Sequence, residues 1–256
     1  MNDVRQPLRV MRRGMNFSQD GPGNRLVIHL QGCNLRCPWC SNPESMPLEG
    51  IELQTNPPRR SCGIMYPEEL AAEAEAAKPL MFGGGGVTLT GGEPTMQYSP
   101  LRETLERCKN AGIHTCVESN ATHPKLQELF TLIDFLILDC KHYNDMEHKR
   151  WTGLDCRQIN ENLRLAAEKR TQLLIRIPLI GGVNASPDDA RQFARHFKSL
   201  GADVFAAEVL RYHTYGQPKW AQCGLEYAMR DAEISDEAFA VFCGILEEAQ
   251  IKLCAT

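Results

Sequence analysis

Residues 26–40 read LVIHLQGCNLRCPWC, an apolar segment that leads directly into a group of cysteines. The apolar run 26–31 predicts a buried β-strand. Cys33, Cys37 and Cys40 follow it with the spacing C-x₃-C-x₂-C. Three thiolates at this spacing can ligate three irons of a cubane iron–sulfur cluster. The fourth iron then keeps an open position, where a small molecule can bind.

Two other interpretations of these cysteines are a structural zinc site and a cluster that only carries electrons. Structural zinc usually has four ligands in two close pairs, and here the fourth ligand would have to be Cys62 or a distant histidine. The remaining cysteines are scattered singly. The odd total of eleven cysteines in the chain, without a secretory signal, argues against a disulfide framework and for a reducing compartment.

Outward from this loop, short apolar runs alternate with helical patterns. We predict strands at 26–31, 87–90, 113–118, 135–139, 173–178 and 204–210, and helices at 68–78, 186–200 and 235–251. This alternation predicts an α/β fold with parallel strands covered by helices. The pattern alone allows either an open doubly wound sheet or a curved, incomplete barrel.

Polar residues follow several of the predicted strands directly. Besides the cysteine loop, these are the segment 91–93, Glu118, Asp139 and Lys141. In both candidate folds, functional residues gather at the C-terminal ends of the strands. We therefore expect these residues to share one site.

Composition and charge exclude several other classes of protein. The net charge of −4 gives no strong attraction to nucleic acid or anionic lipid. No apolar run approaches the roughly 20 residues of a membrane helix, and the basic N-terminus lacks the apolar segment of a secretory signal. We expect a cytoplasmic monomer that binds neither nucleic acid nor membrane.

Four further motifs accompany the cysteine loop, and together they resemble a known family. They are DGPGNR at 20–25, SNPES at 41–45, the glycine-rich stretch 83–94 ending in GGEP, and YHTYGQPKW at 212–220. The five motifs in this order resemble the glycyl radical enzyme activating enzymes of the radical S-adenosylmethionine superfamily, the group that includes pyruvate formate-lyase activase. The resemblance extends from about residue 10 to 230.

The resemblance implies a single domain over 1–256, folded as a partial (β/α)6 barrel. It implies one 4Fe–4S cluster and S-adenosylmethionine (SAM), whose amino and carboxylate groups bind the open iron. An injected electron then splits the sulfur–C5′ bond, and the 5′-deoxyadenosyl radical removes hydrogen from a glycine Cα of a partner enzyme. Since the chain has no second cysteine cluster, we expect flavodoxin or ferredoxin as the electron donor.

The same resemblance assigns roles to the polar residues after the strands. Gly92 and Glu93 would meet the methionine part of SAM, where a carboxylate can accept from the ammonium group. Lys141, counted with the three cysteines as catalytic, would pair with the SAM carboxylate. Glu118 and Asp139 could hold a monovalent cation nearby. Alternatively, the glycines form only a tight turn and the charges a solvated pair.

The remaining SAM-binding predictions also come from matched motifs. His213 would touch the adenosine part, and Trp39 would pack against adenine or shield the cluster from water. Core packing is the alternative for Trp39. We also assign to the cofactor site the neighbours of these residues, namely Ser41, Asn42, Ser119 and Cys140. Arg176 could pair with carboxylates of a ligand or partner.

The chain departs from its relatives in two ways. Many relatives with the SNPES segment carry a ferredoxin-like insert with two further cysteine clusters, whereas residues 41–90 contain only Cys62. The short activases carry a histidine where this chain has Ser41. The two features point to different branches, so the partner enzyme is not assigned. Two other functions stay open: a radical SAM enzyme for a small molecule or peptide, and a non-catalytic iron–sulfur redox protein.

Overall fold

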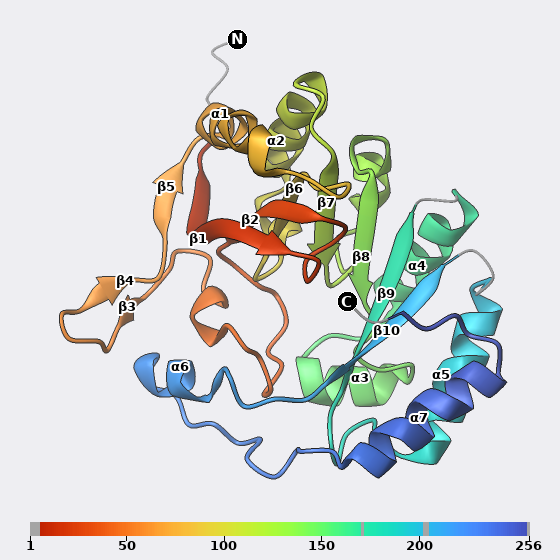
Figure 1. The fold of residues 1–256 in the computed structure, drawn as a ribbon. Helices are drawn as coiled ribbons and strands as arrows, with labels where there is room; N and C mark the ends of the chain where they lie inside the picture. Colours follow the sequence, from red (N-terminus) through yellow and green to blue (C-terminus); the bar gives the residue numbers. More distant parts are fainter. Residues whose placement is uncertain (1–5, 170–171, 202–204, 255–256) are drawn as a thin grey trace.

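Six parallel strands form the centre of the computed structural model, which describes residues 6–169, 172–201 and 205–254. They lie side by side in chain order as β2 (Asn24–Leu30), β6 (Val87–Gly91), β7 (Thr115–Ser119), β8 (Phe135–Asp139), β9 (Leu173–Leu179) and β10 (Ala206–Arg211) (Figure 1). A doubly wound sheet reverses its strand order at one point. Here the order does not reverse, and right-handed crossovers then keep the helices on one face. The partial barrel is therefore confirmed.

The barrel stays open on one side. An antiparallel strand, β1 (Leu8–Phe17), extends the sheet beyond β2, and β5 (Gly63–Met65) pairs with β1. The eight-stranded sheet thus ends at β5 and β10, and these two strands do not pair. A separate two-stranded ribbon, β3 (Glu52–Leu53) and β4 (Arg59–Arg60), lies in the connection between β2 and β6.

Most of the α-helices lie along the outside of the curved sheet, as Figure 1 shows, and the last two follow β10 instead of connecting strands. The α-helices are α1 (Pro67–Ala77), α2 (Tyr98–Asn110), α3 (Asp145–Thr152), α4 (Arg157–Glu168), α5 (Pro187–Ser199), α6 (Gln217–Gln222) and α7 (Asp236–Glu248). Short 3₁₀ helices are η1 (Pro43–Ser45), η2 (Lys78–Leu80), η3 (Pro94–Gln97) and η4 (Leu126–Leu132). None of the helices in the described ranges is long and apolar enough to cross a membrane.

The predicted strands and helix starts agree closely with the structure. Ser186 and Ser235 cap α5 and α7, each accepting a backbone hydrogen bond at 3.1 Å from the residue three positions later. The strand predicted at 113–118 is β7, which begins at Thr115, two residues later than predicted. Of the strand predicted at 204–210, Val204 lies outside the described residues, and β10 begins at Ala206.

The two faces of the parallel sheet differ in chemistry. Apolar side chains such as Leu26, Ile28 and Leu89 join the core under the helices. The alternate residues face the barrel interior, which is partly polar: Thr90 on β6 donates to the Glu118 carboxylate on β7 at 3.0 Å. This alternation places charged groups inside the barrel and aliphatic ones outside.

Arg25 fixes the entry into the first parallel strand. Its side chain is fully buried, and its guanidinium donates to Thr88 Oγ1 (2.7 Å), Pro22 O (3.0 Å) and Val87 O (2.7 Å). Gly23 packs on the backbone of the glycine-rich stretch, because a Cβ there would lie 2.4 Å from Phe82 O. The segment 20–25 is thereby attached to the glycine-rich stretch before β6.

Replacement of Arg25 tests this attachment. We expect Arg25→Met to lower the free energy of unfolding by about 3 kcal/mol, since several buried acceptors lose their donor. Exposed Arg195 provides the matched control, and Arg195→Met should change the free energy by less than about 0.5 kcal/mol. Urea denaturation followed by circular dichroism measures both, and equal effects would contradict the structural role.

Candidate active site

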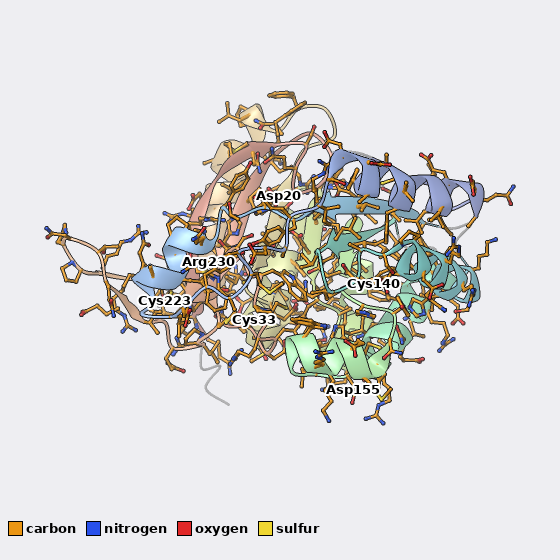
Figure 2. The ribbon with its side chains drawn as sticks, turned by 90° about the horizontal axis from the view of Figure 1, so that it is seen from below. Asp20, Cys33, Cys140, Asp155, Cys223 and Arg230 are labelled. Atoms are coloured by element: carbon orange, nitrogen blue, oxygen red, sulfur yellow. The ribbon has the colours of Figure 1, made fainter. Side chains whose placement is uncertain are left out.

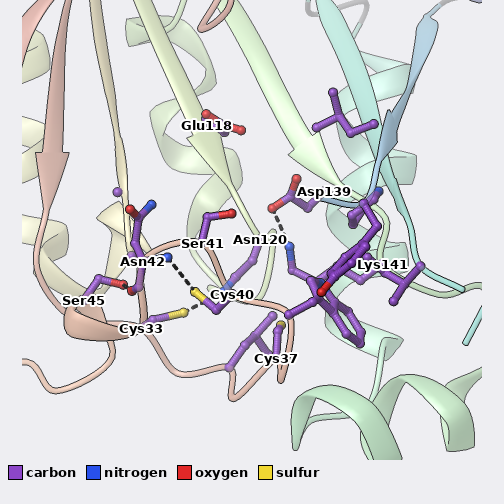
Figure 3. A pocket seen from close by; sticks show the side chains of 18 of the residues that line it. Cys33, Cys37, Cys40, Ser41, Asn42, Ser45, Glu118, Asn120, Asp139 and Lys141 are labelled. Atoms are coloured by element: carbon purple, nitrogen blue, oxygen red, sulfur yellow. Dashed lines mark hydrogen bonds and ion pairs between the residues drawn. The ribbon is translucent and has the colours of Figure 1, made fainter. Parts of the chain in front are cut away.

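A cavity of about 250 Å³ opens at the C-terminal ends of the parallel strands (Figure 3). Most of the predicted site residues line it, namely Cys33, Cys37, Trp39, Cys40, Ser41, Asn42, Gly92, Glu118, Asp139, Lys141 and His213. Gly91 of the expected segment 91–93 lines it too, and residues that were not predicted complete the wall: Leu35, Ser45, Asn120, Pro178, Ile180, Leu210, Arg211 and Tyr212. The structure therefore brings four of the five sequence motifs to one cavity, whereas the segment 20–25 lies at the opposite end of the barrel, where Arg25 contacts the start of β6.

The cysteine loop is held in place by backbone hydrogen bonds to distant segments. Gly32 N donates to Ser45 O at 2.7 Å, and Arg36 N donates to Thr152 O, at the end of α3, at 2.8 Å. Within the loop, Cys40 N donates to Cys37 O at 3.1 Å. These bonds fix the backbone that carries the thiols.

All three thiols face the cavity (Figure 3). Burial raises the pKa of Cys33 and of Cys37 to about 12, and it raises the pKa of Cys40 as well. Buried thiols are neutral without a metal, and iron favours their thiolate form. Asn42 N donates to Cys40 Sγ at 3.4 Å. Three thiols that face one cavity are suitable as the three protein ligands of a 4Fe–4S cluster.

Lys141 provides a positive charge in the cavity. Its ammonium contacts the Asp139 carboxylate at 2.7 Å, and its side chain is only 14% exposed. Burial lowers the pKa of Lys141, but Asp139 together with the neighbouring Cys37 and Cys33 holds the pKa above its ordinary value. The lysine therefore stays charged beside the thiols.

Glu118 belongs to a buried ion-pair network. Arg176 donates to Glu118 at 2.6 Å and to Glu208 at 2.7 Å. Burial raises the pKa of Glu118, and the attraction of Arg176 offsets this only in part. Both carboxylates of the predicted cation site thus have a side-chain partner, since Asp139 pairs with Lys141. Arg176, predicted to meet carboxylates of a ligand or partner, pairs with two of the protein itself.

Glu93 lies behind the cavity wall and does not line it. Its side chain is fully buried, and its carboxylate accepts from Thr95 N (3.0 Å), Ser119 Oγ (2.8 Å) and Asn120 N (2.6 Å). Burial raises the pKa of Glu93, while these donors lower it. The carboxylate thus joins the end of β6 to the turn after β7, and Ser119 serves that contact.

Cys140 also lies away from the cavity. Its side chain is buried in the core under the helices, and Figure 2 shows it apart from Cys33. Strand alternation could have predicted this placement, because Asp139 and Lys141 on either side both face the cavity. Only its two neighbours contribute side chains to the cavity wall.

The glycine pair of the GGEP motif packs against the base of the cysteine loop. Gly91 has a φ of +123°, and a Cβ at Gly92 would lie 2.3 Å from Gly32 O. The next residue, Glu93, donates its N–H to the same Gly32 carbonyl at 2.7 Å. The pair thus allows close approach of two backbones at the cavity wall.

Two aromatic side chains, Trp39 and His213, line the cavity. Trp39 is 8% exposed, and its ring lies 6.3 Å from that of Trp151 on α3. His213 stacks on Tyr215 at a ring distance of 4.2 Å, and burial lowers the pKa of His213. The neighbouring Tyr212 hydroxyl lies 2.6 Å from that of Tyr227.

Comparisons with known proteins agree with this site. A family model described as the radical SAM superfamily matches residues 27–194. The chain belongs to the radical SAM superfamily. A pyruvate formate-lyase-activating enzyme from Clostridium pasteurianum is 32% identical over 225 residues, which cover 85% of this chain and 87% of that protein. One from Staphylococcus aureus is 31% identical over 227 residues, covering 85% and 86%. This radical SAM enzyme is therefore a member of the family of glycyl radical enzyme activating enzymes.

Solved structures show the same fold. A domain of a pyruvate formate-lyase-activating enzyme from Bacteroides vulgatus superposes with a TM-score of 0.55 and 27% identity, covering 66% of this chain and 98% of that one. A radical SAM methyltransferase from Sphaerobacter thermophilus gives a TM-score of 0.64 at 16% identity, covering 98% and 76%. Membership of the superfamily implies a 4Fe–4S cluster and SAM.

Substitution of Gly92 tests the packing at the base of the loop. We expect Gly92→Ala to fold but to hold roughly tenfold less iron after anaerobic reconstitution, since displaced supporting groups typically cost 10–100-fold in metal affinity. A Cβ at Gly244 on α7 meets no atom within 4 Å, so Gly244→Ala is the control and should load like the parent protein. Iron and sulfide analysis gives the result, and full loading of Gly92→Ala would contradict the account.

Proposed function

We propose that this radical SAM enzyme is a glycyl radical enzyme activase. It reductively cleaves SAM at a 4Fe–4S cluster, and the resulting 5′-deoxyadenosyl radical removes hydrogen from a glycine Cα of a partner enzyme. The observation that carries the proposal is the convergence of three thiols and a buried ammonium on one cavity. The chain that forms this cavity aligns over 85% of its length with pyruvate formate-lyase-activating enzymes.

Cys33, Cys37 and Cys40 are the cluster ligands in this proposal. When bound, the cluster supplies an open iron for the amino and carboxylate groups of SAM and the electron that breaks the sulfur–C5′ bond. The protein holds the thiols on a backbone fixed by distant hydrogen bonds. It also limits the access of water, because Leu35 and Trp39 of the loop are buried beside Cys37.

The other cavity residues orient SAM. The ammonium of Lys141 faces the cavity and is available to the SAM carboxylate. Gly92 has no side chain, so SAM can approach its backbone at the cavity wall. His213 and Trp39 present rings to the adenosine part. Glu93 and Ser119 lie behind the cavity wall and do not contact SAM. Their hydrogen bond and that of Asn120 N to Glu93 fix the turn that carries Asn120.

We also assign a monovalent cation to the region between Glu118 and Asp139. The carboxylates of Glu118, Asp139 and Glu208 outnumber the cations Lys141 and Arg176 around this end of the barrel. A cation would offset the excess negative charge next to the SAM carboxylate. Its binding requires rearrangement of the ion pairs that both carboxylates make.

A protein partner suits the open side of the barrel. Leu210, Arg211 and His213 line both the cavity and a second depression of about 660 Å³ beside β10, which also includes residues of α7. The two spaces therefore meet at the edge of the sheet. A glycine on an extended loop can enter there, since it has no side chain and its Cα is accessible.

The electron donor and the cellular setting follow from the same chemistry. The eight cysteines outside the loop are not grouped in the sequence as a second cluster, so we assign reduction to flavodoxin or ferredoxin. We propose a single-domain monomer that acts in the cytoplasm, under anaerobic conditions. Activity with a donor system that lacks both proteins would contradict the assignment of the donor.

SAM cleavage tests the proposed chemistry. We expect Cys33→Ala, Cys37→Ala and Cys40→Ala each to abolish dithionite-driven formation of 5′-deoxyadenosine, because each removes a cluster ligand. Cys62→Ala serves as the matched control and should keep the parent rate, since this thiol does not line the cavity. Chromatography of the products measures the rate. Retained turnover in a loop variant, or loss in the control, would contradict the ligand assignment.

A further inference from the structure

Two side chains of α6 bind the backbone that follows the last cysteine of the loop. Trp220 Nε1 donates to Cys40 O at 2.9 Å, and Lys219 Nζ donates to Ser41 O at 2.9 Å. Lys219 also donates to Asn42 Oδ1 at 2.6 Å. These contacts join residues about 180 positions apart in the sequence, and Figure 2 shows the α6 region that carries Cys223 near Cys33.

The start of α6 packs directly on the same backbone. A Cβ at Gly216 would lie 2.6 Å from Cys40 O and 2.8 Å from Ser41 Cα, so only glycine allows this approach. The ring of Trp220 packs against Tyr227 at 5.7 Å, within the apolar cluster that surrounds the loop. The α6 contact is therefore a built interface that combines close packing with three hydrogen bonds.

The contacted residues act on the Cys40 sulfur and on the cavity wall. Asn42 N donates to Cys40 Sγ at 3.4 Å, and Asn42 O accepts from Ser45 Oγ at 2.6 Å. Ser41, Asn42 and Ser45 all line the cavity. By binding Ser41 and Asn42, Lys219 thus fixes the hydrogen bond from Asn42 N to Cys40 Sγ. It also fixes the part of the cavity wall that these residues form.

Lys219 also forms an ion pair next to the loop. Its ammonium lies 3.4 Å from Glu44 Oε1, and the two side chains are 28% and 11% exposed. The other Glu44 oxygen is buried without a hydrogen-bond partner in the described ranges. The two charges beside the loop act in opposite directions on a negatively charged cluster, since the Lys219 cation attracts it and the Glu44 anion repels it.

We propose that Lys219 and Trp220 are positioning residues for the cluster, and that the Lys219–Glu44 pair sets its reduction potential. The inference rests on the proposed function only in that the cluster is bound by Cys40. A positive charge and hydrogen bonds near the sulfurs favour the reduced, more negative cluster. Lys219 therefore raises the potential, and Glu44 lowers it.

Charge substitutions give results of opposite sign. We expect Lys219→Met to lower the midpoint potential of the reconstituted cluster, and Glu44→Gln to raise it. The double variant should return close to the parent value, because the two charges are removed together. Exposed Lys198 provides the control, and Lys198→Met should leave the potential unchanged. Redox titration followed by electron paramagnetic resonance measures all four variants.

A second measurement uses the protein without its cluster. Hydrogen–deuterium exchange of segment 41–46 should become roughly tenfold faster in Lys219→Met and in Trp220→Phe, since each loses hydrogen bonds that anchor this segment against local opening. Trp220→Phe keeps the ring and removes only the N–H donor. Lys198→Met again serves as the control.

The outcomes separate this inference from the proposed function. Shifts of the same sign in Lys219→Met and Glu44→Gln would overturn the role of this pair in setting the potential, and unchanged exchange of 41–46 would overturn the positioning role. If the parent protein binds a cluster but yields no 5′-deoxyadenosine, the proposed function fails. The potentials and exchange rates still decide the inference in that case, since neither requires SAM cleavage.

Discussion

The attachment of the cysteine loop to the rest of the chain is the constraint on which the structure depends. A loop of this length has too few internal contacts to fix three thiols, so distant segments supply them. The Gly32 carbonyl accepts from Glu93 N at the end of β6, and Arg36 N donates to Thr152 O on α3. Trp220 holds the Cys40 carbonyl from α6. The partial barrel brings these segments to one end because its strands are parallel and in chain order.

The polar barrel interior is the second consequence of this arrangement. Charges buried in a cavity are unfavourable unless they are paired. Arg176 lies between Glu118 and Glu208, and Lys141 contacts Asp139. The pairs keep charged groups next to the thiols before any ligand binds, and they supply oriented partners for a zwitterionic molecule such as SAM. The same pairing means that a cation between Glu118 and Asp139 competes with the protein's own side chains.

The parallel strands and the main site could be predicted from the sequence, because apolar runs ending in polar motifs reveal strand ends. β1 was not predicted, since its arginines and exposed residues hide the strand pattern. Glu93 was expected to contact SAM, but its carboxylate accepts hydrogen bonds from Ser119 and Asn120. No local sequence pattern reveals these contacts. Cys140 could have been placed correctly by strand alternation. The contacts of Lys219 and Trp220 with the cysteine loop depend on tertiary folding alone, so spacing could not reveal them.

The most direct test of the account follows a hydrogen atom from the partner to SAM. A glycyl radical enzyme, such as a pyruvate formate-lyase, is prepared with glycine deuterated at Cα and incubated anaerobically with the reconstituted protein, SAM and dithionite. Mass spectrometry of the 5′-deoxyadenosine should show one deuterium, together with a glycyl radical signal in the partner. Unlabelled 5′-deoxyadenosine alongside a verified glycyl radical would contradict direct abstraction from the glycine Cα.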